Sequence, residues 1–451
     1  MGFSKDFVWG VATSSYQIEG AAFEDGKGLS IWDTYSHEPG KVFEGHHGDV
    51  ACDHYHRYKE DIRLMAELGV KAYRFSVSWP RVLSGGTGAV NEKGIAFYSD
   101  LVDEMLKYGI TPYLTLYHWD MPYELYKRGG WLNPDMPRWF AEYAALIAER
   151  LGDRVKNYMT FNEPQVFIGL AFVDGVHAPG HRYTRGETLL MAHHVMLAHG
   201  LAAQAIRGKV ADARIGYAPT SNVPVPVTME ERDVEAARRA YFEMPENGDW
   251  SWNTAWWSDP IVLGHYPEDG VKILEKDMPK IGQDDMRIIH QPLDFYGQNI
   301  YRGEPVRAGE DGKAIHVPYP EGSPKTAIGW HVNFDCLYWG TRFLYERYQK
   351  PIFITENGMS SHDWVHLDGK VHDPQRIDYL QRHLQWLKKA AEEGVDIAGY
   401  FQWSFMDNFE WARGYHDRFG IVYVDYQTQE RIPKDSFYWY QQMIRENGEN
   451  L

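Results

Sequence analysis

The sequence predicts an α/β fold, a single (β/α)8 TIM barrel that covers residues 1–451 as one catalytic domain. Two observations predict it. Short apolar or β-branched runs recur eight times, and segments with helical spacing of apolar residues separate most of them. No low-complexity linker or change in composition divides the 451 residues, and α/β barrels often exceed the usual domain length. Strands that alternate with helices in one unit are typical of a parallel barrel.

Each predicted strand is a run of apolar residues that ends at Gly, Pro or polar residues. The runs cover residues 7–14, 72–79, 111–119, 155–163, 215–221, 295–301, 351–356 and 397–405. Amphipathic helices are predicted between them at residues 53–68, 94–107, 136–151, 188–206, 335–348 and 374–393. In the first helix, Ile62, Met65 and Leu68 share one face. The connections after the fifth and sixth strands are long, so we expect βα-loop insertions at the C-terminal face, notably within residues 222–293.

Composition restricts the cellular setting and the partners. The net charge of −17 disfavours nucleic acid and anionic membranes. Two cysteines, Cys52 and Cys336, are too few for a disulfide framework or a cysteine-based metal site. The N-terminal residues do not resemble a secretory signal, and no apolar run approaches a membrane span. We therefore expect a cytoplasmic protein with no nucleic-acid or membrane partner, and a homo-oligomer is compatible with the sequence.

Two glutamates stand at the ends of predicted strands, where Pro or Gly follows. Glu163 lies in the segment TFNEP, residues 160–164, and Glu356 lies in ITENG, residues 354–358. The C-terminal ends of parallel barrel strands converge on the face where ligands bind. Two carboxylates that face one cleft are the minimum equipment for breaking a glycosidic bond. We therefore expect Glu163 and Glu356 to form a catalytic pair.

Glycoside hydrolysis requires the two carboxyl groups to differ in protonation. One gives a proton to the departing oxygen, and the other is ionised and faces the anomeric carbon. Two like charges a few Å apart keep one group protonated, and a nearby cation lowers the pKa of the other. Arg74 lies inside an apolar run, and a buried arginine needs an anionic partner. We expect Glu356 to be that partner.

Polar and aromatic side chains gather at the ends of the predicted strands, whereas the strand interiors are apolar. They are Gln17, Arg74, His118, Trp119, Asn162, Asn299, Tyr301 and Trp403. Amides and imidazoles offer directional hydrogen bonds, and tryptophan offers a flat apolar face, so this set can hold a polyol. The C-terminal face is therefore predicted to be a sugar site.

The chain resembles glycoside hydrolase family 1, the β-glucosidase family. The segments around Glu163 and Glu356 are similar to the two catalytic signatures of that family. Further motifs of the family match residues 7–20, 48–55, 73–81 and 403–411. The matches occur in order from about residue 3 to the C-terminus, so the resemblance covers the whole chain.

The resemblance implies a retaining mechanism with Glu163 as the acid/base and Glu356 as the nucleophile. It also implies that Arg74 and Tyr301 hold Glu356, with Asn299 in the same network. The implied hydroxyl-binding residues are Gln17, His118, Asn162, Glu410 and Trp411, with Trp119 beside them. Trp403 would be the stacking platform of the sugar, and Trp330 the aromatic wall for the leaving group.

We expect a β-glucosidase that acts on cello-oligosaccharides and aryl glucosides without a metal or an organic cofactor. Relatives that act on 6-phosphorylated sugars carry a small hydroxyl residue in place of Glu410, so a neutral sugar is favoured. Plant thioglucosidases carry Gln in place of Glu163, so O-glycosides are favoured. Arg413 departs from the family pattern and leaves the leaving-group preference open.

Other functions remain as alternatives. A β-galactosidase or β-fucosidase would use the same hydroxyl-binding residues. A non-catalytic sugar-binding barrel could lose either glutamate, and the presence of both opposes it. His46, His47, His193, His194 and His199 lack a His-x-x-x-His pattern with a carboxylate, so we expect loop and helix histidines there and no metal site.

Overall fold

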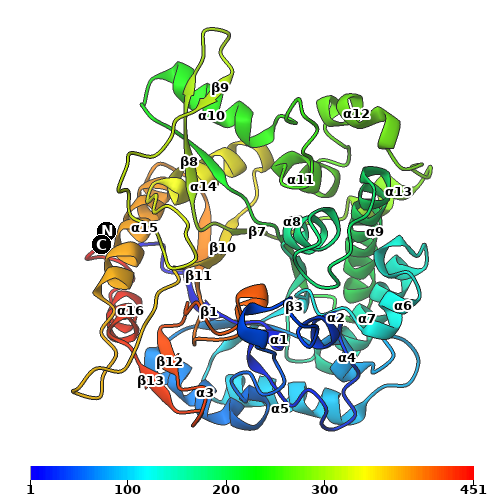
Figure 1. The fold of residues 1–451 in the computed structure, drawn as a ribbon, viewed down its shortest axis with the longest axis vertical. Helices are drawn as coiled ribbons and strands as arrows, with labels where there is room; N and C mark the ends of the chain where they lie inside the picture. Colours follow the sequence, from blue (N-terminus) through cyan, green and yellow to red (C-terminus); the bar gives the residue numbers. More distant parts are fainter. Residues whose placement is uncertain (1) are drawn as a thin grey trace.

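Eight parallel strands form the centre of the molecule in the computed structural model, which describes residues 2–451 (Figure 1). They are β1 (Val8–Ala12), β2 (Ala72–Ser76), β3 (Thr111–Tyr117), β4 (Asn157–Asn162), β5 (Arg214–Ala218), β7 (Tyr296–Asn299), β10 (Ile352–Asn357) and β11 (Ile397–Trp403). Their order is β5-β4-β3-β2-β1-β11-β10-β7, which is the order of a TIM barrel. All eight predicted strands and the predicted fold are confirmed.

The barrel closes between β5 and β7. Thr220, just after β5, forms a parallel bridge with Asn299, and the Asn299 N–H donates to the Pro219 carbonyl over 2.9 Å. At the other end of the seam, the Asp294 N–H donates to the Ile215 carbonyl over 2.9 Å. Seven of the predicted strands run too far at their C-terminal ends, because those residues leave the ladder to form the loops of the barrel mouth, whereas β10 ends one residue later than predicted.

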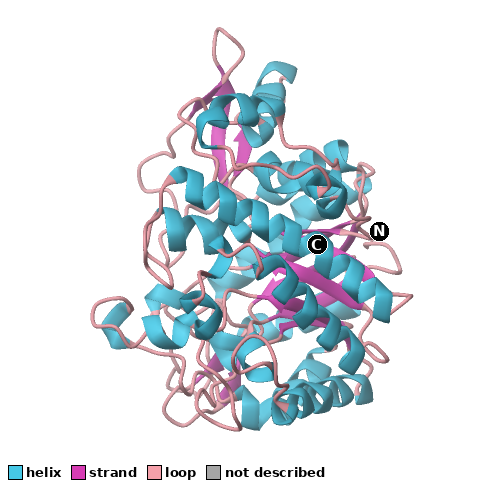
Figure 2. Cartoon of the chain, turned by 90° about the vertical axis from the view of Figure 1, so that its right-hand side faces the viewer, coloured by secondary structure: helices cyan, strands magenta, loops and turns pink. Residues whose placement is uncertain are grey.

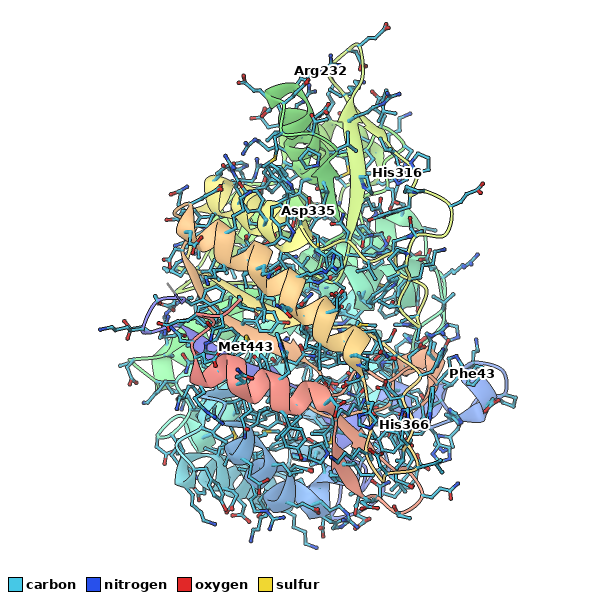
Figure 3. The ribbon with its side chains drawn as sticks, turned by 90° about the vertical axis from the view of Figure 1, so that its left-hand side faces the viewer. Phe43, Arg232, His316, Asp335, His366 and Met443 are labelled. Atoms are coloured by element: carbon cyan, nitrogen blue, oxygen red, sulfur yellow. The ribbon has the colours of Figure 1, made fainter. Side chains whose placement is uncertain are left out.

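Helices surround the barrel, as Figure 2 shows. The six predicted helices are confirmed as α3 (His54–Leu68), α5 (Glu92–Lys107), α7 (Met136–Leu151), α9 (Arg185–Lys209), α14 (Cys336–Tyr348) and α15 (Pro374–Glu392). The helix α16 (Asp435–Arg445) was not predicted. It lies beside α15 on the outside of the barrel, with Met443 buried (Figure 3), and its Tyr440 hydroxyl donates to the Gly10 carbonyl over 2.8 Å.

The helix α9 is long and apolar enough to cross a membrane by length and composition alone. It packs within the helical layer, however, and 72% of its most apolar window is buried. Its capping box is complete, since Thr184 and Glu187 each bond the backbone of the other. It is therefore a core helix of this fold.

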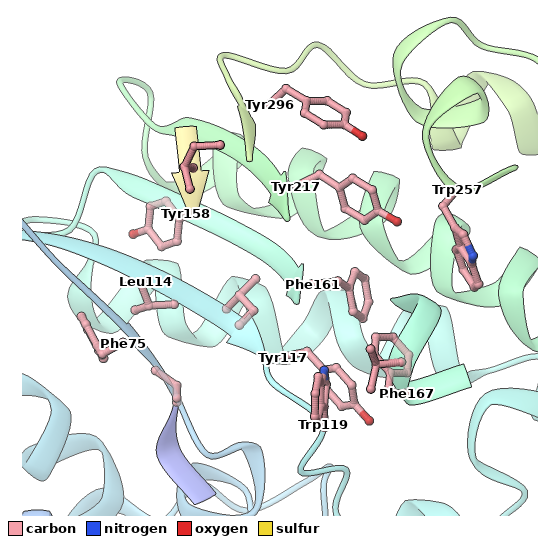
Figure 4. Close-up of a cluster of buried hydrophobic side chains, with 14 of the residues drawn as sticks. Phe75, Leu114, Tyr117, Trp119, Tyr158, Phe161, Phe167, Tyr217, Trp257 and Tyr296 are labelled. Carbon is pink, nitrogen blue, oxygen red and sulfur yellow. The ribbon is translucent and has the colours of Figure 1, made fainter. Parts of the chain in front are cut away.

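Aromatic side chains fill both the helix–sheet interface and the barrel interior. Between strands and helices, Tyr117, Phe161 and Phe167 pack together (Figure 4), and the rings of Phe161 and Phe140 stack with centroids 4.5 Å apart. Inside the barrel, the ring centroids of Phe295 and Phe353 are 5.1 Å apart. A Cβ at Gly216 would lie 2.1 Å from the Phe295 ring, so only glycine fits beside it. This aromatic plug forms the base beneath the barrel mouth.

Insertions after β5 and β7 build a lobe at one end of the molecule (Figures 1 and 3). The strands β6 (Val223–Pro226), β8 (Gly303–Ala308) and β9 (Ala314–His316) form a small sheet, which was not predicted. The helical pieces expected in residues 222–293 are α10 (Glu231–Phe242), α11 (Thr254–Val262), α12 (Glu268–Leu274) and α13 (Asp285–Ile289). The division of the chain into one domain stays a prediction.

Candidate active site

A cavity of about 890 Å³, including its open mouth, lies at the C-terminal ends of the barrel strands. The predicted residues that line it are His118, Trp119, Glu163, Tyr301, Trp330, Glu356, Trp403, Glu410 and Trp411. The other predicted residues, Arg74, Asn162, Asn299 and Gln17, are buried and bond to the lining residues. The structure therefore brings all the predicted site residues together, although it does not test their roles.

Glu356 is held through both of its oxygens. Arg74, from β2, donates from Nη1 to Oε1 over 2.6 Å, and the Tyr301 hydroxyl donates to Oε2 over 2.6 Å. Arg74 is itself fixed, because its Nη2 donates to Asn162 Oδ1 over 2.6 Å and its Nε donates to Thr115 Oγ1 over 3.2 Å. Arg74 and Glu356 are both almost fully buried. Their short charge-assisted hydrogen bond fixes the position of the carboxylate.

Glu163 has a weaker set of partners. Asn299 Nδ2 donates to its Oε1 over 2.7 Å, and no salt bridge reaches it from the described part of the chain. Its backbone is in the left-handed region, with φ of 47°, where β4 turns into α8 (Pro164–Ile168). Trp119 and Trp411 also have positive φ, of 78° and 51°. Strained backbone of this kind gathers at functional sites.

The two glutamates differ in how firmly they hold a proton. Burial and then the charge of Glu356 raise the pKa of Glu163 to about 8. Burial also raises the pKa of Glu356, whereas Arg74 and Tyr301 oppose that increase. The expected Arg74–Glu356 contact is present, but the net direction is not the lowering predicted from the sequence, because burial outweighs the cation. Since only Glu356 has a cation, a proton shared by the pair resides on Glu163.

His118 presents an unpaired donor to the cavity. Asn162 Oδ1 accepts from Arg74 and, over 2.9 Å, from Asn299, so its Nδ2 donates to His118 Nε2 over 3.0 Å. Burial and then Arg74 hold the pKa of His118 well below its usual value, so the ring is neutral and carries its proton on Nδ1. Within residues 2–451, this buried Nδ1 has no partner. It is therefore available to a ligand hydroxyl.

Gln17 lies behind Glu410. Its Oε1 accepts from Ser14 over 2.6 Å, and its Nε2 donates to the Phe409 carbonyl over 2.8 Å and to Asn408 Oδ1 over 3.0 Å. The same Nε2 lies 3.5 Å from Glu410 Oε2. Burial, followed by the charge of Asp417, raises the pKa of Glu410 well above its ordinary value. The expected repulsion of phosphorylated sugars requires an ionised Glu410, and burial disfavours that state.

Aromatic rings form the remaining walls. The His118 and Trp403 rings are stacked with centroids 5.8 Å apart, and Trp119 packs against Trp411 at 4.5 Å. On another wall, Trp330 lies 5.3 Å from Tyr301. Flat apolar faces beside hydrogen-bonding groups are what a sugar ring requires.

Sequence reasoning missed much of the cavity wall. The missed lining residues are Val166, Leu170, His177, Thr220, Ser221, Asn222, Trp252, Arg302, Ile328, Ala412 and Phe419. They belong to loops and short helices whose position depends on the fold. For Ser221 and Arg302 a signal existed, because Ser221 ends the fifth predicted strand and Arg302 directly follows the sixth. Arg413, noted as a departure from the family pattern, also lines the cavity.

Comparison with known proteins places this geometry in a family. β-Glucosidase A of Thermotoga maritima is 46% identical over 449 residues, which are 99% of this chain and 98% of the relative. A bifunctional β-D-glucosidase/β-D-fucosidase of Bifidobacterium breve is 41% identical, with 99% of both chains covered. The structure of a Thermotoga maritima β-glucosidase in complex with deoxynojirimycin has a TM-score of 0.91 and covers 99% of both chains at 46% identity. The model of glycosyl hydrolase family 1 matches residues 1–449, and the chain belongs to that family.

Proposed function

We propose that this protein is a retaining β-glucosidase that removes terminal non-reducing β-D-glucosyl residues from cello-oligosaccharides and aryl glucosides. One observation carries the proposal. Two buried carboxyl groups line one cavity, and only Glu356 is paired with a cation. Relatives of similar length that are named β-glucosidases support the choice of sugar. The proposed steps use no metal and no organic cofactor.

In the first step, Glu163 and Glu356 act together on the glycosidic bond. Glu163, protonated because of its pKa of about 8, donates its proton to the leaving oxygen. The ionised Glu356 attacks the anomeric carbon, so a glycosyl–oxygen bond to the enzyme forms as the glycosidic bond breaks. Tyr301 and Arg74 hold the attacking carboxylate in position.

In the second step, water replaces the leaving group. Glu163, now a carboxylate, takes a proton from the water, which attacks the anomeric carbon and releases Glu356. Two displacements at one carbon restore the β-configuration. Double displacement requires carboxyl groups about 5–5.5 Å apart. This separation is too short for the water that a single, inverting displacement places between a carboxylate and the anomeric carbon.

We assign the sugar to the part of the cavity between Glu410, His118 and Trp403. His118 offers its unpaired Nδ1–H, and Glu410 offers two oxygens, of which Oε2 lies 3.5 Å from Gln17 Nε2. A preference for fucose, which lacks the 6-hydroxyl, stays the alternative because the Bifidobacterium breve relative is named for both sugars. Glu410→Ser should lower kcat/KM on glucosides by roughly 10- to 100-fold and on fucosides by less, since a buried hydroxyl left without its partner costs about 1–3 kcal/mol.

A substrate panel with product stereochemistry tests the function. Purified protein should hydrolyse 4-nitrophenyl β-glucoside and cellobiose, and proton NMR should show β-glucose as the first product. Parallel assays with β-galactoside, β-fucoside and 6-phospho-β-glucoside rank the alternatives. The proposal is wrong if α-glucose appears first, or if Glu163→Gln and Glu356→Gln leave turnover unchanged.

Three further assignments rest on composition and are proposals as well. We infer a cytoplasmic location from the two unpaired cysteines. We infer that the natural binding partner is an oligosaccharide substrate. We also infer one folding unit. Cell fractionation should place the protein in the cytoplasmic fraction. Calorimetry should show a single cooperative unfolding transition.

A further inference from the structure

Arg302 is a cation in the cavity wall without an anionic partner. Its Nε donates to the Asn222 side-chain oxygen over 2.7 Å. Among residues 2–451, no carboxylate lies within ion-pair distance of its guanidinium, although the charge of Glu304 is felt there. The other arginines of the site are paired, Arg74 with Glu356 and Arg413 with Asp417. In a chain with a net charge of −17, a half-buried arginine without a counter-ion is unusual.

Arg302 lies on the side of the cavity that receives the leaving group. Its partner Asn222 follows Thr220, which is close enough to Glu163 to lower the pKa of that residue. A proton donor must face the glycosidic oxygen, so this side accepts the aglycone. The Trp330 ring centroid lies 5.7 Å from the Arg302 guanidinium carbon. Arg302 and Trp330 therefore offer a cation beside a flat apolar wall.

The charges in the cavity show why such a cation matters. Glu163, Glu356 and Glu410 all line the cavity, and the ionised Glu356 disfavours an anionic ligand. A neutral disaccharide has no need of a guanidinium, whereas a carboxylate matches its forked donors. Arg302 also borders an outer hollow lined by Glu304, Tyr319 and His331, so a charged group bound there keeps part of its water. Electrostatic discrimination at this position is therefore moderate.

We propose that Arg302 is a specificity residue that selects aryl β-glucosides whose aromatic aglycone carries a carboxylate. The ring would lie against Trp330, and the carboxylate would bind the guanidinium. The bonds that form and break are those of the proposed function, on which this inference rests.

The test compares 4-carboxyphenyl β-glucoside with its methyl ester at pH 7, where the acid is ionised, at low salt. The measured quantity is the ratio of the two kcat/KM values, so effects shared by both substrates cancel. Arg302→Met should lower this ratio by roughly 10-fold, because a charge-assisted contact is lost and the ionised Glu356 remains. Arg302→Lys should retain part of the preference, and added salt should reduce it in the wild type.

Arg307→Met is the matched control. Arg307 is exposed on β8, the strand that begins directly after Arg302, and its replacement changes the net charge equally. Its ratio should equal that of the wild type. Cleavage of the glycosidic bond in the methyl-ester substrate reports folding and the proposed function, and it does not depend on the role of Arg302. This inference is wrong if all variants cleave the glycosidic bond of the methyl-ester substrate and the ratio is unchanged in Arg302→Met. If the wild type does not cleave that glycosidic bond, the proposed function itself is overturned.

Discussion

The surroundings of Glu163 and Glu356 differ although the two side chains are chemically identical. Both are buried at the ends of barrel strands and line one cavity. Glu356 accepts from Arg74 and Tyr301 at 2.6 Å each, whereas Glu163 accepts from the neutral amide of Asn299. The difference teaches that neighbours contributed by other strands assign the acid and the nucleophile, because burial alone would raise both pKa values alike.

The two surroundings are joined, so neither glutamate is independent. Asn299 Nδ2 donates to Glu163 Oε1 and to Asn162 Oδ1, and Asn162 Oδ1 also accepts from Arg74. Substitutions on one side are therefore expected to affect the other. Their effects on activity should be non-additive.

The largest expected effect is that of Glu356→Gln. Without the carboxylate no glycosyl–enzyme can form, so kcat should fall by roughly 10⁴-fold or more on every glucoside. Steady-state assays on aryl glucosides and cellobiose measure it, with circular dichroism as the folding control. Residual activity within tenfold of the wild type would show that Glu356 is not the nucleophile.

Glu163→Gln should have a smaller effect that depends on the substrate. Proton donation contributes roughly 10²- to 10⁴-fold, and it matters most for leaving groups of high pKa. The rate of the first step should therefore collapse for cellobiose and change little for 2,4-dinitrophenyl β-glucoside. A plot of log kcat/KM against leaving-group pKa measures this slope. Equal losses across the series would remove Glu163 from the role of acid.

The pH profile sharpens the contrast between the two groups. Wild-type kcat/KM should fall above a pH of about 8, because Glu163 must be protonated. Tyr301→Phe removes a donor to the ionised Glu356, so the pKa of Glu356 rises and the acid limb moves to higher pH more than the alkaline limb does. The rate should fall roughly 10- to 100-fold. An unmoved acid limb would assign that limb to another group.

The smallest expected effects are on stability, and they have opposite signs. The pKa of Glu163 is raised from 4.5 in the unfolded chain to about 8, so the fold loses stability as the pH rises between these two values, where the unfolded chain releases a proton that the folded chain keeps. Glu163→Gln should raise the Tm at pH 9 by a few °C relative to the wild type and by less at pH 5. Glu356→Gln leaves Arg74 buried without a counter-charge, so it should lower the Tm. Two shifts of the same sign would contradict the contrast.

The barrel strands could be predicted because each is a local pattern. Eight apolar runs with polar ends define the ring and place Glu163 and Glu356 on one face. The Arg74–Glu356 pair could also be inferred, since a buried arginine requires an anion. The small sheet β6-β8-β9 could not, because β6 and β9 are short, β6 and β8 contain proline, and the strands pair across distant insertions.

The pKa shifts that burial causes could also not be predicted from the sequence. The carboxyl groups of Glu356 and Glu410 have raised pKa values because the surrounding loops bury them, and no local motif reports burial. Arg302 follows a predicted strand, yet its position beside Trp330 depends on how the long connection between β7 and β10 folds back on itself.

The stereochemistry of azide rescue tests the division of roles most directly. Glu163→Ala and Glu356→Ala are each given 2,4-dinitrophenyl β-glucoside with azide, and NMR identifies the glucosyl azide formed. Glu163→Ala still forms the glycosyl–enzyme, so azide should displace Glu356 and give the β-azide. Glu356→Ala lacks the nucleophile, so azide should attack the substrate directly and give the α-azide. The same anomer from both variants, or the two anomers exchanged, would contradict the assignment of Glu163 as the acid/base and Glu356 as the nucleophile.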